Sequence, residues 1–194
     1  MKLYYVPGAC SLAVDIALRE AEIQFEGVLV DLSTRTCADG KPFADVTPKG
    51  YVPVLIDQQG QTITEMVAVL FAVAEQAGQT EAIPPIKLLE MLAFISTELH
   101  RNFRSFYRDA EQPELERQRG EIANRLDQMA SLLAGDYIFG SAQPSVADAY
   151  LFTILFWCDF MQLPKPARLT AFQERMAQRP AVTEALAFEG LGPR

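Results

Sequence analysis

The sequence predicts an α/β protein with an added all-helical part. Three observations lead to this prediction. Short segments rich in Val and Tyr, which are typical of strands, occur only in the first third of the chain. The stretch GQTEAIPPIK (78–87) contains Pro84 and Pro85, which prevent one helix from running across it. Beyond this stretch the apolar residues recur at helical spacing. We therefore expect an α/β domain at 1–80, a linker at 81–87 and a helical domain at 88–194.

The first elements form a predicted βαβ unit. KLYYV (2–6) is strand-like and ends at the turn residues Pro7 and Gly8. From Ser11 to Glu20 the apolar residues recur at helical spacing. FEGVLVDL (25–32) is a second predicted strand, and its continuous Val and Leu content predicts burial on both faces, as in a parallel sheet.

The rest of the α/β domain is predicted as two strands and a helix. VPVLIDQQGQTITE (52–65) has two strand-like runs around Gln58-Gln59-Gly60, which indicates a hairpin. EMVAVLFAVAEQAG (65–78) is an apolar helix, and Gly78 is suited to cap its C-terminal end.

The helical domain begins with an amphipathic helix over 88–107, followed by a second over 114–135. The helix within PSVADAYLFTILFWCDFMQL (144–163) is so apolar that we expect it at the centre of a core. Ser145 and Asp148 have the spacing of a capping box at its start. Two shorter helices, over 167–178 and 181–190, complete the prediction.

Composition excludes several classes of function. The chain has 17 basic and 25 acidic residues, a net charge of −8, without the clustered Lys and Arg that nucleic acid requires. Charges interrupt every apolar stretch before about 18 residues, so we expect no membrane span, and the short N-terminal run is no signal peptide. Three widely spaced cysteines form neither a disulfide framework nor a metal pattern, which favours a cytoplasmic protein.

Five segments carry a family resemblance over essentially the whole chain. They are KLYYVPGACSLA at the start, TPKGYVPVL at 47–55, TEMVAVL at 64–70, TELHRNF at 97–103 and SVADAYLF at 145–152. In this order and spacing they make the sequence resemble the cytosolic glutathione S-transferases, most of all the bacterial beta class. The resemblance implies a thioredoxin-like N-terminal domain, a helical C-terminal domain and a homodimer. It also implies glutathione as co-substrate, no metal, and a role in detoxification.

Cys10 is the first candidate catalytic residue. It lies at the predicted N-terminus of a helix, where unpaired N–H groups and the helix dipole stabilise a thiolate and should lower its pKa. The same feature would hold the glutathione sulfur as the nucleophile. The alternative is that Cys10 fills a corner of the core. Ala13 stands where a second cysteine would complete a dithiol motif, so only a mixed disulfide with glutathione remains as redox chemistry.

Two dipeptides are the candidate glutathione-binding segments. The resemblance implies a cis bond between Val52 and Pro53, which turns the Val52 backbone outward to pair with the peptide part of glutathione; a trans proline at a strand start is the alternative. Glu65 and Met66 open a helix whose N–H groups are suited to a carboxylate, and Glu65 to an ammonium group. The alternative is that Glu65 only compensates the helix dipole.

His100, the only histidine, is the second candidate catalytic residue. It lies on a small and polar stripe, beside an apolar one, as a cleft-lining helix requires. The family pattern implies that it faces the thiol, where it could polarise a proton; a half-buried structural histidine is the alternative. Arg35 matches a basic position near the glycyl carboxylate, or is a solvated loop residue. Met66 and Ala93 depart from the usual Ser and Asn, so we expect weaker or altered glutathione binding.

The leading hypothesis is conjugation of glutathione to a small apolar electrophile. Phe103, Phe106 and Phe156 are expected on the electrophile's side of the cleft. Thiolate stabilisation and positioning would supply most of the rate gain. Two alternatives stay open: a thiol transferase or peroxidase that works through a Cys10 mixed disulfide, and a non-catalytic binding protein with the same fold.

Overall fold

The first part of the chain is built on a mixed five-stranded sheet. The computed structural model describes residues 1–108 and 110–192. The sheet has the order β3-β2-β1-β4-β5. Its strands are β1 (Lys2–Tyr5), β2 (Glu26–Asp31), β3 (Thr36–Cys37), β4 (Val54–Ile56) and β5 (Thr62–Thr64). Only β1 and β2 are parallel, with Lys2 opposite Glu26, while the other neighbours are antiparallel. The predicted βαβ unit and hairpin are therefore confirmed.

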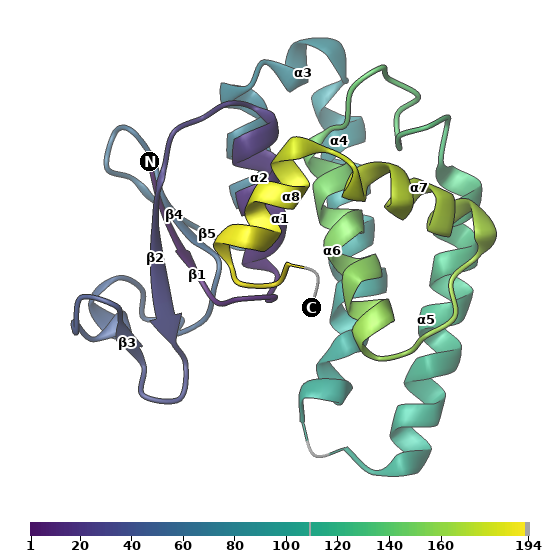
Figure 1. The fold of residues 1–194 in the computed structure, drawn as a ribbon, viewed down its shortest axis with the longest axis horizontal. Helices are drawn as coiled ribbons and strands as arrows, with labels where there is room; N and C mark the ends of the chain where they lie inside the picture. Colours follow the sequence, from purple (N-terminus) through teal and green to yellow (C-terminus); the bar gives the residue numbers. More distant parts are fainter. Residues whose placement is uncertain (109, 193–194) are drawn as a thin grey trace.

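Helices cover this sheet and make up the rest of the chain. Figure 1 shows the sheet at one side, α1 and α2 beside it, and the long helices on the far side of these two. The α-helices are α1 (Ser11–Glu20), α2 (Met66–Gln76), α3 (Gln79–Ala82), α4 (Pro85–Phe94), α5 (Gln112–Leu132), α6 (Val146–Phe160), α7 (Ala167–Ala177) and α8 (Pro180–Phe188). Short 3-10 turns and one π-helical segment are η1 (Phe43–Asp45), η2 (Ile95–Leu99) and η3 (His100–Tyr107). An α/β domain with an added helical part is the predicted fold class, and the structure confirms it.

One apolar core runs through both parts. The central α1 packs on α2, α6 and α8, and all but two of its residues are buried. The predicted central helix, α6, is buried along most of its length. Its N-terminus has the predicted capping box, in which Ser145 Oγ and Ser145 N–H donate to Asp148 Oδ2 at 2.7 Å each. The other oxygen of Asp148 accepts from Ile138 N–H at 2.8 Å, which fixes the preceding loop.

Two expectations about local structure are wrong. β2 is not buried on both faces, because Val30 is its only buried residue and Leu29 is 42% exposed. No single helix crosses the stretch around Pro84 and Pro85, as predicted, since α3 ends at Ala82 and α4 begins at Pro85, where a missing N–H costs nothing. The helix predicted over 88–107 is α-helical only to Phe94. It continues as the π-helical η2 and the 3-10 segment η3, so His100 does not lie in the register of a regular α-helix.

Candidate active site

The loop before α1 is held in place from three sides. Ser11 is fully buried, and its hydroxyl bonds both the N–H and the C=O of Val6, at 3.2 and 3.3 Å. Gly8 has a left-handed backbone with φ of 71°. Its N–H donates to Glu189 Oε2 at 2.7 Å, and its C=O accepts from Trp157 Nε1 at 2.8 Å. Residues of the helical part therefore fix the loop that leads to Cys10.

Cys10 is the N-cap of α1, as predicted, but its pKa is not lowered as expected. Its Sγ lies 3.4 Å from the C=O of Val52, to which the thiol donates. Burial raises the pKa of Cys10 to about 12, and this outweighs the nearby backbone N–H groups of Cys10 and Ser11, which lower it. Glu189 and Glu65 raise it further. The expected low pKa is therefore wrong: in this structure Cys10 is a neutral thiol that acts as a hydrogen-bond donor.

The segment opposite Cys10 is the turn before β4. The Val52-Pro53 bond is cis, as the resemblance implied. Outside the sheet ladders of the described residues, the one hydrogen bond of the Val52 backbone is that from Cys10. Arg35 is exposed and has a left-handed φ of 57°. Its guanidinium lies 3.7 Å from where a Cβ on Gly50 would be, so it reaches the loop that leads to Val52.

Glu65 precedes α2 with a φ of 72°, which turns its side chain away from the helix. Its Oε1 accepts from Lys49 Nζ at 2.6 Å and from Tyr51 Oη at 2.7 Å. The Lys49 ammonium, followed by the Tyr51 hydroxyl, lowers the pKa of Glu65 and keeps it ionised. Met66 directs its bulk into the main core, where it is 6% exposed. An ammonium group thus already occupies the position beside Glu65 that we expected for a ligand.

His100 lies in a cluster of aromatic residues from α6 and η3. Its Nδ1 is 2.6 Å from Tyr150 Oη, and its ring meets Trp157 edge-on, with 4.9 Å between ring centres. Burial lowers the pKa of His100 to about 4, so the imidazole is neutral at pH 7. Cys10 lies close enough to Tyr150 and Tyr107 to raise the pKa of both hydroxyls, after the larger effect of their burial.

The expected apolar wall is only partly present. Phe103 is completely buried and packs on Trp157 at 5.4 Å, so it belongs to the core and does not line an open cleft. Phe106 and Phe156 are half-buried. The ring of Phe156 also lies 3.9 Å from where a Cβ on Gly8 would be, beside the loop that leads to Cys10.

Sequence reasoning missed several residues of this site. Tyr150 and Trp157 were assigned to the core, because a helix apolar all round gives no sign of which face meets a cleft. Lys49 and Tyr51 stood within the motif TPKGYVPVL and were passed over for the residues that follow them. Glu189 is 5% exposed, although a lone acidic residue near a helix end is usually at the surface. The SVADAYLF motif was the one signal that pointed to Tyr150.

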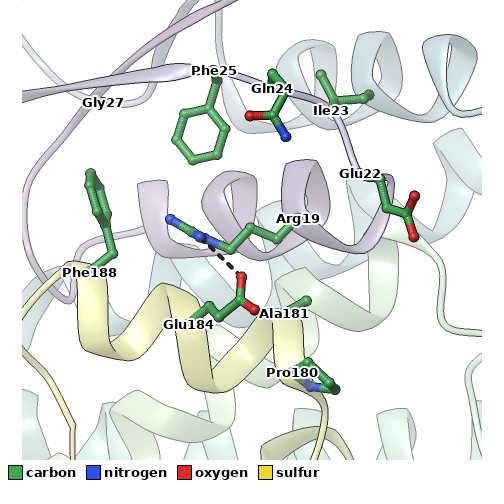
Figure 2. A pocket seen from close by; sticks show the side chains of 10 residues that line it. All are labelled: Arg19, Glu22, Ile23, Gln24, Phe25, Gly27, Pro180, Ala181, Glu184 and Phe188. Atoms are coloured by element: carbon green, nitrogen blue, oxygen red, sulfur yellow. Dashed lines mark hydrogen bonds and ion pairs between the residues drawn. The ribbon is translucent and has the colours of Figure 1, made fainter.

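A separate cavity of about 510 Å³ lies between the end of α1, the start of β2 and α8. Figure 2 shows Arg19 at its centre, with its ion pair to Glu184 dashed and with Phe25 and Phe188 on either side. The guanidinium lies 5.5 and 5.2 Å from the two ring centres. No group of His, Cys, Asp and Glu side chains suited to a metal occurs within residues 1–108 and 110–192. In the same residues no helix is both long and apolar enough to cross a membrane.

Comparisons with known proteins agree with this geometry. Residues 8–76 match the family model of the glutathione S-transferase N-terminal domain, and residues 112–187 match that of the C-terminal domain. The glutathione S-transferase GstA of Escherichia coli O157:H7 is 36% identical, over 98% of this chain and all of that protein. A ternary complex of BphK, a bacterial glutathione S-transferase, is 40% identical with a TM-score of 0.92, and 98% of this chain and all of that one are covered.

A glutathione S-transferase from a sphingomonad, solved with glutathione, is 37% identical with a TM-score of 0.90, over 99% of this chain and all of that one. The five-stranded sheet with its helices is a thioredoxin-like domain, and it is joined to an all-helical domain. The chain belongs to the glutathione S-transferase family and is one of its bacterial members. It is therefore a glutathione transferase.

Proposed function

We propose that this enzyme conjugates glutathione, its co-substrate, to small apolar electrophiles at the site around Cys10. The observation that carries the proposal is the contact of 3.4 Å between Cys10 Sγ and the C=O of Val52. This contact places the Cys10 thiol, which can stabilise the sulfur of a bound ligand, beside the Val52 backbone. An extended tripeptide can pair with this backbone as an added strand. Glutathione is bound in the related structures of the sphingomonad enzyme and of a glutathione transferase homologue from Sulfitobacter.

Each end of glutathione has a partner in this arrangement. The γ-glutamyl carboxylate binds at the N-terminus of α2, at Met66. The ammonium group of the same γ-glutamyl residue displaces the Lys49 ammonium from Glu65. Arg35 takes the glycyl carboxylate, since its guanidinium is suited to paired hydrogen bonds and already reaches the Gly50 loop. The cysteinyl backbone pairs with Val52, and this leaves the sulfur beside Cys10.

Cys10 and His100 act as donors to the glutathione thiolate. Because the pKa of Cys10 is raised to about 12 and that of His100 lowered to about 4, both groups are neutral near pH 7 and keep a hydrogen to donate. The glutathione thiol loses its proton to solvent, and its sulfur then forms a bond to the electrophilic carbon as the bond from that carbon to the leaving group breaks; with a chlorodinitrobenzene the leaving group departs as chloride. Donors fixed before the reaction stabilise this anion at little reorganisation cost.

The raised pKa of Cys10 also favours conjugation over the mixed-disulfide alternative. A thiol must ionise to attack a disulfide, and burial opposes this ionisation. Treatment with oxidised glutathione should therefore leave Cys10 unmodified in the intact-protein mass. A glutathione adduct on Cys10 would instead support the thiol transferase.

The main test replaces Cys10 and measures conjugation of a chlorodinitrobenzene against pH. One hydrogen bond to a charged group is worth about 1.5–3 kcal/mol, so C10A should lose roughly 10- to 100-fold in kcat. Its pH profile should move to higher pH, because the pKa of bound glutathione rises. C10S keeps a donor and should recover part of the loss, and the matched control C37A, at a buried cysteine of β3, should not differ from the parent. If C10A equals the parent at every pH, Cys10 has no catalytic role.

Calorimetric titration with glutathione separates an enzyme from a binding protein that retains only the fold. Saturation at or below millimolar glutathione is expected of the enzyme. The absence of a heat of binding at this concentration would favour the non-catalytic binding protein.

The remaining features belong to the same proposal. We expect a cytoplasmic homodimer with a role in detoxification, divided into a glutathione-binding domain at 1–80, a linker at 81–87 and a substrate domain at 88–194. Light scattering on the purified protein tests the dimer: a mass near twice the 21.6 kDa of one chain is expected.

A further inference from the structure

The hydrogen-bond partners of His100 determine which tautomer of its neutral ring is present. A neutral imidazole carries one N–H, at Nδ1 or at Nε2, and the other nitrogen is an acceptor. Nδ1 lies 2.6 Å from Tyr150 Oη. Because burial keeps the pKa of His100 near 4, this choice applies at all pH values at which the enzyme works.

The Tyr150 hydroxyl is itself completely buried, so its hydrogen needs an acceptor. Burial, followed by the nearby Cys10, raises the pKa of Tyr150 and keeps it protonated, while the Ser96 hydroxyl lowers it. Among the described residues, the one contact of Tyr150 Oη with hydrogen-bond geometry is that with His100 Nδ1. A hydrogen on Nδ1 would leave the buried phenol hydrogen without an acceptor, so the geometry favours the phenol as the donor.

The length of the contact supports the same direction. N–H···O bonds span about 2.7–3.2 Å, whereas bonds in which a hydroxyl donates to oxygen reach down to about 2.5 Å. A separation of 2.6 Å therefore fits a phenol that donates to Nδ1 better than an Nδ1–H that donates to the phenol.

The backbone explains how His100 reaches this hydroxyl. The π-helical η2 (Ile95–Leu99) inserts into the helix directly before His100, and such segments are frequent at functional sites. Tyr150 and Trp157 both come from α6. The edge-on contact with Trp157 restrains the ring from another side.

We propose that Tyr150 is a positioning residue, which donates its phenol hydrogen to His100 Nδ1 and so holds His100 in the tautomer with its hydrogen on Nε2. The catalytic consequence, that the Nε2–H is available to the glutathione sulfur, rests on the proposed function. The tautomer itself does not.

The sole histidine makes a direct test simple, because selective ¹⁵N labelling of histidine places signals in one imidazole only. In the parent enzyme at pH 7 we expect one nitrogen bearing hydrogen, assigned to Nε2, and an acceptor nitrogen at Nδ1. Y150F removes the donor, and its two nitrogens should shift toward an average of both tautomers. Y137F is the matched control, a buried tyrosine whose hydroxyl meets Arg179 instead, and it should leave them unchanged.

Kinetics complete the test. Loss of one hydrogen bond should lower kcat of Y150F about five-fold, with little change in the KM for glutathione. A hydrogen found on Nδ1 in the parent would overturn the proposal, and so would ring signals of Y150F that equal those of the parent. The parent spectrum decides even if Y150F fails to fold. If the spectra are as expected but H100N conjugates normally, the tautomer assignment stands and the catalytic role of His100 fails.

Discussion

Glu189 makes a definite prediction for stability against pH. It follows α8, is 5% exposed, and burial raises its pKa to about 8 from an ordinary value of 4.5, with Asp15 raising it further. The Gly8 N–H and Arg19 act in the opposite direction. Tyr5 and Cys10 are the other titratable groups that its charge affects. Among the described residues, Glu189 Oε1 has no partner at all.

The sign follows from where the proton is bound. Below pH 4.5 Glu189 is protonated in both the folded and the unfolded chain, so its full contribution to the free energy of unfolding is present there. Between pH 4.5 and about 8 the folded chain holds a proton that the unfolded chain has released, so folding weakens as pH rises. At about 1.4 kcal/mol for each pH unit, the ceiling of the loss above pH 8 is about 5 kcal/mol.

The variant E189Q tests this with little change of shape. Its amide oxygen still accepts from Gly8 N–H, and it does not titrate. Urea unfolding, followed by the fluorescence of the single Trp157 at fixed protein concentration, should show parent stability falling from pH 5 to 9 and a clearly flatter profile for E189Q. E174Q, at an exposed glutamate of α7, should keep the parent profile. Equal slopes in the parent and E189Q would refute the argument.

Three further predictions concern single contacts. W157F removes the donor to the Gly8 carbonyl, so the free energy of unfolding should fall by about 1–3 kcal/mol in urea titrations; an unchanged midpoint would contradict this. G27A places a Cβ 2.6 Å from the Phe188 ring and should cost about 1–3 kcal/mol, which trimming the ring in G27A/F188L should largely restore. E65Q removes the charge proposed to hold the glutathione ammonium and should raise the Kd about 10-fold or more by calorimetry; a Kd equal to that of the parent would remove Glu65 from the site.

The order of elements could be predicted from the sequence because the signals behind it are local. The predicted helix over 88–107 has an apolar stripe from Leu88 to Phe106, and the structure buries its residues as far as Phe103, while Phe106 is half-buried. The π-helical η2 within this stripe is not predictable, since one wide turn leaves the spacing of the buried residues almost unchanged. The capping box at Ser145 was predictable, because it is completed within four residues.

The properties of the site were less predictable, because they depend on contacts between distant parts of the chain. The local signal at Cys10, a helix N-terminus, indicated a low pKa. Desolvation has the opposite and larger effect, and the charges of Glu189 and Glu65, both far along the sequence, raise the pKa further. Likewise nothing around His100 in the sequence indicates Tyr150, 50 residues away.

These long-range contacts give the helical part a role in the glutathione site. The N–H of Gly8 is held by Glu189 and its C=O by Trp157, so both sides of this residue are fixed from helices at the other end of the sequence. Gly8 lies two residues before Cys10, whose thiol meets Val52. A change in the packing of α6 or α8 is therefore transmitted to the thiol through a stretch of only three residues. The acidity and position of Cys10 are accordingly set by the helical part as much as by the sheet.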